Sequence, residues 1–597
     1  MGRGCGSSLK LVMFFSPMLL IISCGRTDVA VSDRSQQVKQ DVENERLDTG
    51  DETPILTRSE VSELLLLQEK LLKKAKIEVQ GTMMDLPSWL APTDIPFDTA
   101  QYFNIEPEQN GAKHYLRAVA YSKFTDAVSF LPNLKQQFES GKPSAQIEKL
   151  RALDQKIGEV RYHLLDHIFD SDDPSHVRYF ERIAPVFVKN LEAVFNELKL
   201  AHQFQDVVLH QDFSLDALCN VHGFDAVTWD MAILCELSPD SNDAINSLEL
   251  TLKIECNVRK LAAIHTQLIA SRFLRQAVRD QAMTILQATQ DVSTVVQLVE
   301  ILDTSHRAEL ESPRCLELAR FEHLQLRKLL HDVQNDSLEL DPYTFELLGM
   351  SDDDSPILLA HKMMTNGVLG GYEANEDVAI EELEKSVGDQ PEIMAKAKNA
   401  IVESKKSPMN FDAAAALIIP AVFRSVSSMT EEDYSKEISV LKRRYKELEK
   451  ELGVSFPEQM ERLQVLRENW TIDDSWKETK FLKWYRPQSR IGYLSRQSRL
   501  LIDGALSLAC VRKFQLENEG RLPGSVMEAL VAAGIEDPET VVDPYSGKSF
   551  KIRASESKIA NVYSIGPDRK DNSGQPALPI TGFVQEDEGD VVFELEH

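Results

Sequence analysis

The sequence predicts a mainly α-helical protein, in which an irregular multi-helix domain is followed by a small α+β module at the C-terminal end. Apolar residues recur near helical spacing through most of the chain from residue 57 to residue 485, for example in 247–287. After residue 489, a long helix pattern gives way to turn residues and to two short strand patterns, 549–554 and 560–566. We therefore expect four segments, which are 1–23, 24–56, 57–485 and 489–597.

The composition is that of a globular protein with an acidic surface. The chain has 597 residues, enough for roughly two to four domains, and 43% of them are apolar. The formal net charge is −29 and the pI is near 5.0, so the surface repels phosphate backbones and we expect no nucleic-acid partner. Aromatic residues make up only 7%, which predicts a core built mostly of Leu, Ile, Val and Ala.

The N-terminus has the features of an export signal. Arg3 and Lys10 precede an apolar run, 11–23. This run is too short to cross a bilayer, because a spanning helix needs about 17–25 apolar residues. The run ends in the letters IISC, the last of which is Cys24, and this resembles the box of bacterial lipoproteins. The resemblance implies that 1–23 is a lipoprotein signal peptide and that the Cys24 thiol carries diacylglycerol, with palmitate-type chains as the anchor. The alternative is an ordinary cleaved signal followed by an incidental cysteine.

The segment after the signal has the composition of a tether. Residues 24–56 are polar, charged and nearly free of aromatic residues, so they cannot bury enough apolar surface to fold, and we expect disorder. In lipoproteins, an aspartate after the acylated cysteine can retain the protein in the inner membrane, whereas Gly25 stands here. The resemblance therefore implies a membrane-anchored protein on the extracytoplasmic side, in the periplasm or at the outer membrane.

Local signals mark the helical body. Thr57 and Glu60 form a capping box that predicts a helix start, and Pro107 predicts the start of another helix. No repeat of about 34 residues supports a tetratricopeptide array. The sequence contains no nucleophile elbow, P-loop or HExxH motif, so no catalytic set stands out.

The cysteines give no metal or redox motif. Five remain after Cys24, and none of them shows CxxC spacing; they are Cys219, Cys235, Cys256, Cys315 and Cys510. Export permits disulfides, but an odd number leaves at least one thiol free, and most of the five lie in apolar helix patterns where cysteine packs as a small hydrophobe. The sequence leaves their pairing open.

The best histidine cluster is formed by His163 and His167, which lie four residues apart on one helix face and are followed by Asp170. Two histidines at this spacing can hold zinc, but the intervening Glu of HExxH and a third ligand are missing. The alternative is a partly exposed helix end followed by an acidic turn.

The C-terminal module carries a second resemblance. In 493–597 a long helix pattern is followed by the letters GRLP, by DPYSGK and by YSIGPD. This order resembles the soluble part of the major pseudopilin of type II secretion, in which a long helix leads to a small sheet and to a calcium-binding loop. The resemblance covers less than a fifth of the chain.

The pseudopilin resemblance also implies a metal site. Carried over by position, it makes Asp568, Asp571 and Asn572 oxygen donors to calcium, a cation that prefers oxygen ligands on turn-rich loops. The sequence departs from the family pattern at Arg569 and Lys570, whose positive charges weaken cation binding. A solvated turn without metal is the alternative.

Three functions stay open on this basis. The layout of the whole chain resembles a family of exported lipoproteins of planctomycete bacteria. This resemblance implies the domain architecture and the cellular location, but it implies no activity. The first hypothesis is a non-enzymatic, lipid-anchored envelope protein of interaction or scaffold type, with the C-terminal module as a docking element. The second is an extracytoplasmic hydrolase whose site is assembled from scattered residues such as His163, His167 and Asp170. The third is an accessory protein of a secretion system.

Overall fold

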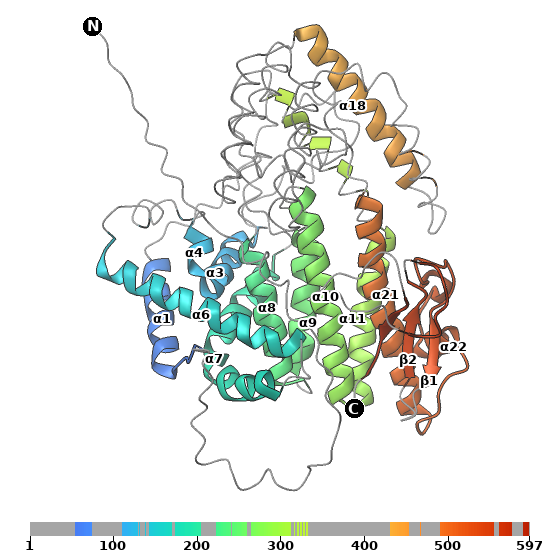
Figure 1. Ribbon diagram of the computed structural model, residues 1–597, viewed down its shortest axis with the longest axis horizontal. Helices are drawn as coiled ribbons and strands as arrows, with labels where there is room; N and C mark the ends of the chain where they lie inside the picture. The colour runs from blue at the N-terminus through green and yellow to red at the C-terminus, as the bar shows by residue number, and fades with distance from the viewer. Residues whose placement is uncertain are drawn as a thin grey trace, which may run out of the picture.

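The computed structural model describes residues 54–73, 110–128, 143–169, 174–204, 222–239, 242–258, 264–311, 430–452, 490–554, 560–566, 568–575 and 589–595, with a few single residues between them (Figure 1). Residues 1–53, which contain the expected signal peptide and Cys24, lie outside this part of the chain.

The prediction of a mainly α-helical protein with a small sheet near the C-terminus is confirmed. The helices in the described part are α1 (Arg58–Leu72), α3 (Ala112–Ser122), α4 (Phe124–Ala127), α6 (Ala145–Phe169), α7 (Pro174–Ala201), α8 (His222–Leu237), α9 (Asn242–Val258), α10 (Ile264–Ala288), α11 (Val292–Glu311), α18 (Glu431–Leu452), α21 (Arg490–Glu517), α22 (Val526–Ala533) and the 3-10 helix η7 (Pro538–Thr540). The strands are β1 (Lys551–Ala554), β2 (Ala560–Ser564) and β3 (Val591–Phe593).

The N-terminal helices enclose a first hydrophobic core at one end of the molecule (Figure 1). α1, α3, α4, α6 and α7 meet α8 there, because each helix presents an apolar stripe at helical spacing. The side chains with no exposed surface in this core include Leu64, Tyr115, Ile157, Phe187 and Met231.

Helix α1 begins at the predicted capping box. Thr57 Oγ1 accepts a hydrogen bond from the Glu60 N–H, and the Thr57 N–H donates to the Glu60 carboxylate at 2.9 Å. Residues before this cap also contact the folded body, since Leu56 is buried in the core and the Tyr179 hydroxyl donates to the Pro54 carbonyl oxygen at 2.7 Å. The last residues of the expected tether, 54–56, therefore belong to the folded body.

The expected helix start, Pro107, lies outside the described residues, and the helix that follows it, α3, begins at Ala112. Asn110 and Gly111 are not helical, and Asn110 Oδ1 accepts a hydrogen bond from the Ala112 N–H at 3.0 Å. A β-carbon at Gly111 would lie 2.4 Å from the carbonyl oxygen of Ala201, at the end of α7. The start of α3 is thus set by a close contact with α7, which is distant in the sequence.

Helix α21 is the central helix of a second core, although it lies near the end of the sequence. α10 and α11 pack against it, and so do α22 and the sheet (Figure 1). One continuous hydrophobic cluster joins these elements, with Ile285, Leu302, Leu506, Leu530 and Phe593 among its fully buried members. The helical body and the C-terminal module therefore share a core.

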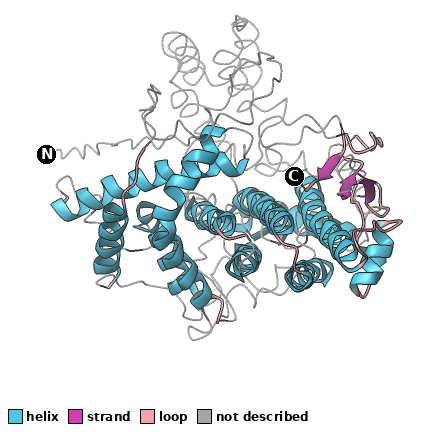
Figure 2. Ribbon diagram, turned by 90° about the horizontal axis from the view of Figure 1, so that it is seen from below, coloured by secondary structure: helices cyan, strands magenta, loops and turns pink. Residues whose placement is uncertain are grey.

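The sheet is antiparallel, with the strand order β1-β2-β3, and lies at the end of the molecule opposite the N-terminal helices (Figure 2). Lys551 is opposite Tyr563 in the first pair of strands, and Val562 is opposite Phe593 in the second. In the turn before β1, buried Asp543 accepts hydrogen bonds from the Tyr545 N–H at 3.0 Å and from the Ser564 hydroxyl at 2.6 Å. These bonds tie the turn to β2.

None of the helices in the described part combines the length with the apolar character that a bilayer-spanning segment requires.

Candidate functional site

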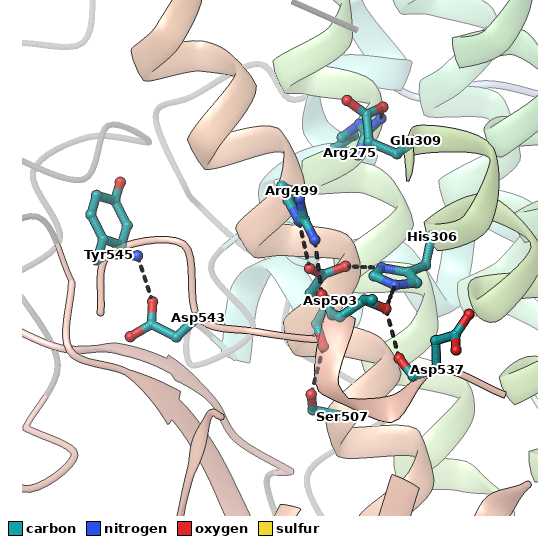
Figure 3. Close-up of polar contacts among 10 residues, drawn as sticks. Arg275, His306, Glu309, Arg499, Asp503, Ser507, Asp537, Asp543 and Tyr545 are labelled. Atoms are coloured by element: carbon teal, nitrogen blue, oxygen red, sulfur yellow. Dashed lines mark hydrogen bonds and ion pairs between the residues drawn. The ribbon is translucent and has the colours of Figure 1, made fainter. Parts of the chain in front are cut away.

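A buried polar cluster lies where the C-terminal module meets the helical body (Figure 3). It consists of His306 on α11, Arg499 and Asp503 on α21, and Thr540 at the end of η7, and we call it the Asp503 cluster. The side chains of His306 and Asp503 are only 2% and 1% exposed. A buried carboxylate is costly unless it is paired and hydrogen-bonded, so the partners of Asp503 decide whether the cluster stabilises the fold.

Both oxygens of Asp503 are engaged. His306 Nδ1 lies 2.7 Å from Oδ1, and Arg499 Nε donates to Oδ2 at 3.1 Å. Arg499 and Asp503 are four residues apart, so they share one face of α21. The contact between His306 and Asp503 joins residues 197 positions apart in the sequence.

Thr540 connects the cluster to the turn that leads into the sheet. His306 Nε2 lies 2.9 Å from Thr540 Oγ1, and Arg499 Nη2 donates to the Thr540 carbonyl oxygen at 2.8 Å. The Thr540 hydroxyl donates to the Asp537 carbonyl oxygen at 2.7 Å. Three separate chain segments are thus held together by one set of hydrogen bonds.

The order of hydroxyl, imidazole and carboxylate is the order that hydrolases use to activate a nucleophile. Here, however, the single hydroxyl proton of Thr540 points to the Asp537 carbonyl oxygen, so Oγ1 is the acceptor toward His306. The guanidinium of Arg499 also occupies the second oxygen of Asp503. This arrangement holds α11, α21 and η7 together, and it does not free the Thr540 hydroxyl to attack a substrate.

A second buried ion pair network lies one helical turn away on α11. Arg275 on α10 donates to Glu255 at 3.1 Å and to Glu309 at 3.0 Å, and Figure 3 shows Arg275 and Glu309 beside the Asp503 cluster. Arg275 is 1% exposed and Glu255 has no exposed side-chain surface. The interior between α9, α10 and α11 is therefore held by charge-assisted hydrogen bonds as well as by apolar packing.

A third buried network joins α6 to α8 in the N-terminal core. Arg161 Nε donates to Asp230 Oδ1 at 2.7 Å, and Arg161 Nη2 donates to the Ser122 carbonyl oxygen at 2.7 Å. Burial raises the pKa of Asp230 above its ordinary value, and the nearby guanidinium of Arg161 opposes that rise. Like the other two networks, this one consists of contacts within the chain.

The residues predicted to bind calcium lie on one exposed loop, but they face different partners. Asp568 Oδ2 accepts from Asn572 Nδ2 at 3.3 Å, whereas Asp571 forms an ion pair with Lys551 on β1. The ion pair with Lys551 lowers the pKa of Asp571, so this carboxylate is ionised and already has a counter-ion. The loop therefore brings Asp568 and Asn572 together and turns Asp571 toward the sheet.

One further carboxylate, Asp590, lies under the same loop. It is 1% exposed and accepts hydrogen bonds from the Asn572 N–H at 3.2 Å and from the Gly574 N–H at 2.6 Å. Burial raises its pKa, and the charges of Asp571 and Asp568 raise it further. Among the residues that the structure describes, no group of three His, Cys, Asp or Glu side chains is placed to hold a metal ion, and calcium binding stays a prediction.

The two histidines of the second hypothesis face aromatic side chains. The ring centroid of His163 is 5.5 Å from that of Tyr179, and that of His167 is 4.5 Å from that of Phe180, both on α7. His167 Nε2 also lies 3.8 Å from a carboxylate oxygen of Glu236. Asp170 lies outside the described residues. The two histidines thus help to pack α6 on α7 and α8.

Two of the five cysteines have described side chains. Cys235 and Cys510 are both buried and free, on α8 and α21 respectively. Cys219, Cys315 and the side chain of Cys256 lie outside the described part, so the pairing of these three stays open.

The residues of the Asp503 cluster were not predicted from the sequence. The spacing of Arg499 and Asp503 is a local signal for an ion pair, but such pairs are common on solvated helix faces. The sequence did contain one indication of a buried charge. Asp503 interrupts an otherwise apolar stretch of α21, in which Leu501, Ile502 and Ala505 are all buried. A charge in such a stripe predicts a buried partner but does not say which residue it is.

Comparisons with protein-family models, with curated proteins and with solved structures find no match.

Proposed function

We propose that the protein is a lipid-anchored envelope protein of the interaction or scaffold type, attached to the extracytoplasmic side of a membrane through Cys24. The proposed cellular location rests on the IISC box at the end of a short apolar run, which is preceded by basic residues. Acyl chains contribute about 0.8 kcal/mol for each buried CH₂ group, so two or more chains would hold the protein firmly at a bilayer.

The Asp503 cluster and the shared core support the part of the proposal that assigns a scaffold function. His306, Asp503 and Thr540 bind α11, α21 and η7 to one another, and Phe593 of the sheet lies in the same core as Leu302 of α11. A body and a module joined in this way form one unit with a shared core. Such a unit suits a protein that presents binding surfaces away from the membrane.

The hydrolase hypothesis receives less support. The described polar clusters are satisfied by contacts within the chain, and His163 and His167 pack against aromatic rings of α7. A hydrolytic site needs a nucleophile or an activated water within reach of a free base. Thr540 and His306 are within hydrogen-bond distance, but the hydroxyl proton of Thr540 is directed to the Asp537 carbonyl oxygen.

Calcium binding would fit the scaffold function as a stabiliser of the C-terminal loop. The buried carboxylate of Asp590 lies close enough to Asp568 and Asp571 for their charges to raise its pKa. A cation held by Asp568, Asn572 and backbone carbonyl oxygens would relieve this repulsion. If it binds, calcium will raise the melting temperature of the wild-type protein, and Asp568→Asn will reduce that gain. Equal melting curves with calcium and with a chelator would contradict calcium binding without affecting the lipid anchor.

The anchor is tested by comparing Cys24→Ala with Cys5→Ala in a bacterial host that lipidates proteins. We expect the wild-type protein and Cys5→Ala in the membrane fraction with acylated intact masses, because Cys5 lies in the segment that the signal peptidase removes. Cys24→Ala should lose the acyl mass and leave the membrane fraction. A native product that retains Met1 and carries no acyl group would overturn the proposal.

A further inference from the structure

Strand β1 lies at the edge of the three-stranded sheet. The strand order is β1-β2-β3, and within the described part of the chain β1 pairs only with β2. One row of its backbone N–H and C=O groups therefore points away from the sheet. Such a row is a template on which another extended segment can form backbone hydrogen bonds.

Five exposed cations surround this edge, in contrast to the chain as a whole, although the carboxylates of Asp568 and Asp571 lie on the neighbouring loop. Lys551 and Arg553 lie on β1 itself and are exposed, and Lys548, just before the strand, is exposed too. Arg569 and Lys570 add two exposed cations on the loop that follows β2. A chain with a formal net charge of −29 thus carries a group of cations around one strand edge.

Lysines on an edge strand often serve to prevent aggregation, so this alternative has to be weighed. Here the cations of β1 are held on one face of the sheet. Lys551 forms an ion pair with Asp571, and Arg553 Nη1 donates to the carbonyl oxygens of Ser573 at 3.3 Å and Gly574 at 3.2 Å. Both side chains therefore contact the loop on that face, and within the described part of the chain no strand pairs with the outer edge of β1.

The alternation of side chains along β1 decides what the edge can accept. Lys551 and Arg553 are two residues apart and share one face, while Ile552 points to the opposite face and packs against the core. Two copies of this chain that paired through β1 would bring like charges together, which is destabilising. A segment with carboxylates at alternate positions would instead place opposite charges beside Lys551 and Arg553.

We infer that the outer edge of β1 binds an extended, acidic segment of a partner protein by adding it as a fourth strand to the sheet. Backbone hydrogen bonds would provide the pairing, and carboxylates at alternate positions would provide specificity through the cations of β1. This inference rests on the proposed scaffold function and names the chemistry of one partner.

The test uses the purified full-length protein and a fluorescent peptide of alternating Glu and Val, with binding followed by fluorescence anisotropy. We expect saturable binding of this peptide and none of the matched peptide of Lys and Val. Methylating alternate backbone nitrogens on the pairing side of the acidic peptide should abolish binding, since it removes the hydrogen bonds. Raising the salt concentration to about 0.5 M should weaken binding by about tenfold, because exposed charges are screened.

Variants of the protein make the test specific. Arg553→Glu should weaken binding of the acidic peptide by about tenfold or more. Lys73→Glu, which changes an exposed cation at the C-terminal end of α1, at the other end of the molecule, should leave binding unchanged. Circular dichroism should show that both variants are folded.

The inference is overturned if the acidic peptide does not bind, if the methylated peptide binds equally well, or if the basic peptide binds as tightly. It is also overturned if vesicles of anionic lipid bind with the same dependence on Arg553 while the peptide does not. Each of these outcomes leaves the membrane anchor untouched, because the anchor is tested separately through acylation of Cys24.

Discussion

The ring of Phe593 on β3 lies directly over Gly504 on α21. A β-carbon at position 504 would be 2.0 Å from Cζ of that ring, and both residues are fully or almost fully buried. The absence of a side chain at Gly504 therefore allows the last strand of the sheet to pack on the helix that the sheet shares with α10 and α11. This contact is one of the places where the C-terminal module is joined to the helical body.

Gly504→Ala should destabilise the protein. The new methyl group has no room unless Phe593 moves, and overpacking of a core costs about 1–3 kcal/mol, occasionally more. Gly158→Ala is the matched control, because Gly158 also lies inside a helix, α6, but a β-carbon there meets no atom within 4 Å. That control should stabilise the protein by about 0.5–1 kcal/mol through helix propensity. Urea unfolding would measure both changes, and equal shifts in the two variants would contradict the packing argument.

Asp503→Ala should cost about 3–5 kcal/mol, since it leaves the charge of Arg499 and the hydrogen-bonding nitrogen of His306 without their buried partner. Glu517→Gln is a control on the same helix. It removes a surface ion pair with Lys513, which is expected to contribute less than about 1 kcal/mol. Denaturant unfolding followed by circular dichroism gives both values. A loss below about 1 kcal/mol for Asp503→Ala would show that the cluster does not hold α11 to α21.

The thiols of Cys235 and Cys510 should not react in the native protein. Burial raises the pKa of the Cys510 thiol to about 12 and also raises that of Cys235, so neither forms a thiolate at neutral pH. Iodoacetamide treatment followed by peptide mass spectrometry should find both cysteines unmodified until the protein is unfolded in guanidinium. Rapid labelling of Cys510 without denaturant would indicate that α21 separates from α10 and α11.

The stability of the protein should fall as the pH is lowered below about 6.5, in part because of His202 and His323. Burial lowers the pKa of His202 to about 4 and that of His323 to about 3. Between those values and the ordinary histidine pKa, the unfolded chain binds protons that the folded chain excludes, so acid favours unfolding. We expect His202→Gln to reduce the loss of unfolding free energy between pH 6.5 and pH 4 in urea titrations. An unchanged slope in this range would contradict the assignment to His202.

Some of the fold follows from local sequence. The capping box of Thr57 and Glu60 was predicted and is present, because it depends on residues three positions apart. The strands near 549–554 and 560–566 were marked by turn residues in the sequence. The start of α3 at Ala112 was not predicted, because the contact between Gly111 and Ala201 is invisible in the local pattern.

Less of the candidate site could be predicted. The calcium loop was assigned from a resemblance, and the structure shows that Asp568 and Asn572 face each other while Asp571 faces Lys551. The difference comes from β1, which supplies a cation from outside the loop. His306 carries no motif at all, since its partners lie 197 and 234 positions away.

By itself, the sequence determined the helical class, the capping box of α1 and the strand-forming character of the tail, because these depend on hydrogen bonds and side-chain periodicity within a few residues. Only the tertiary structure decided that α21 is the centre of a core shared with α10 and α11, and that Asp503 meets His306. The physical reason is that helical spacing shows which face of a helix is apolar, but any apolar face can cover another. The choice of partner depends on shape and on buried charges, such as the fit of Phe593 over Gly504, between segments far apart in the chain.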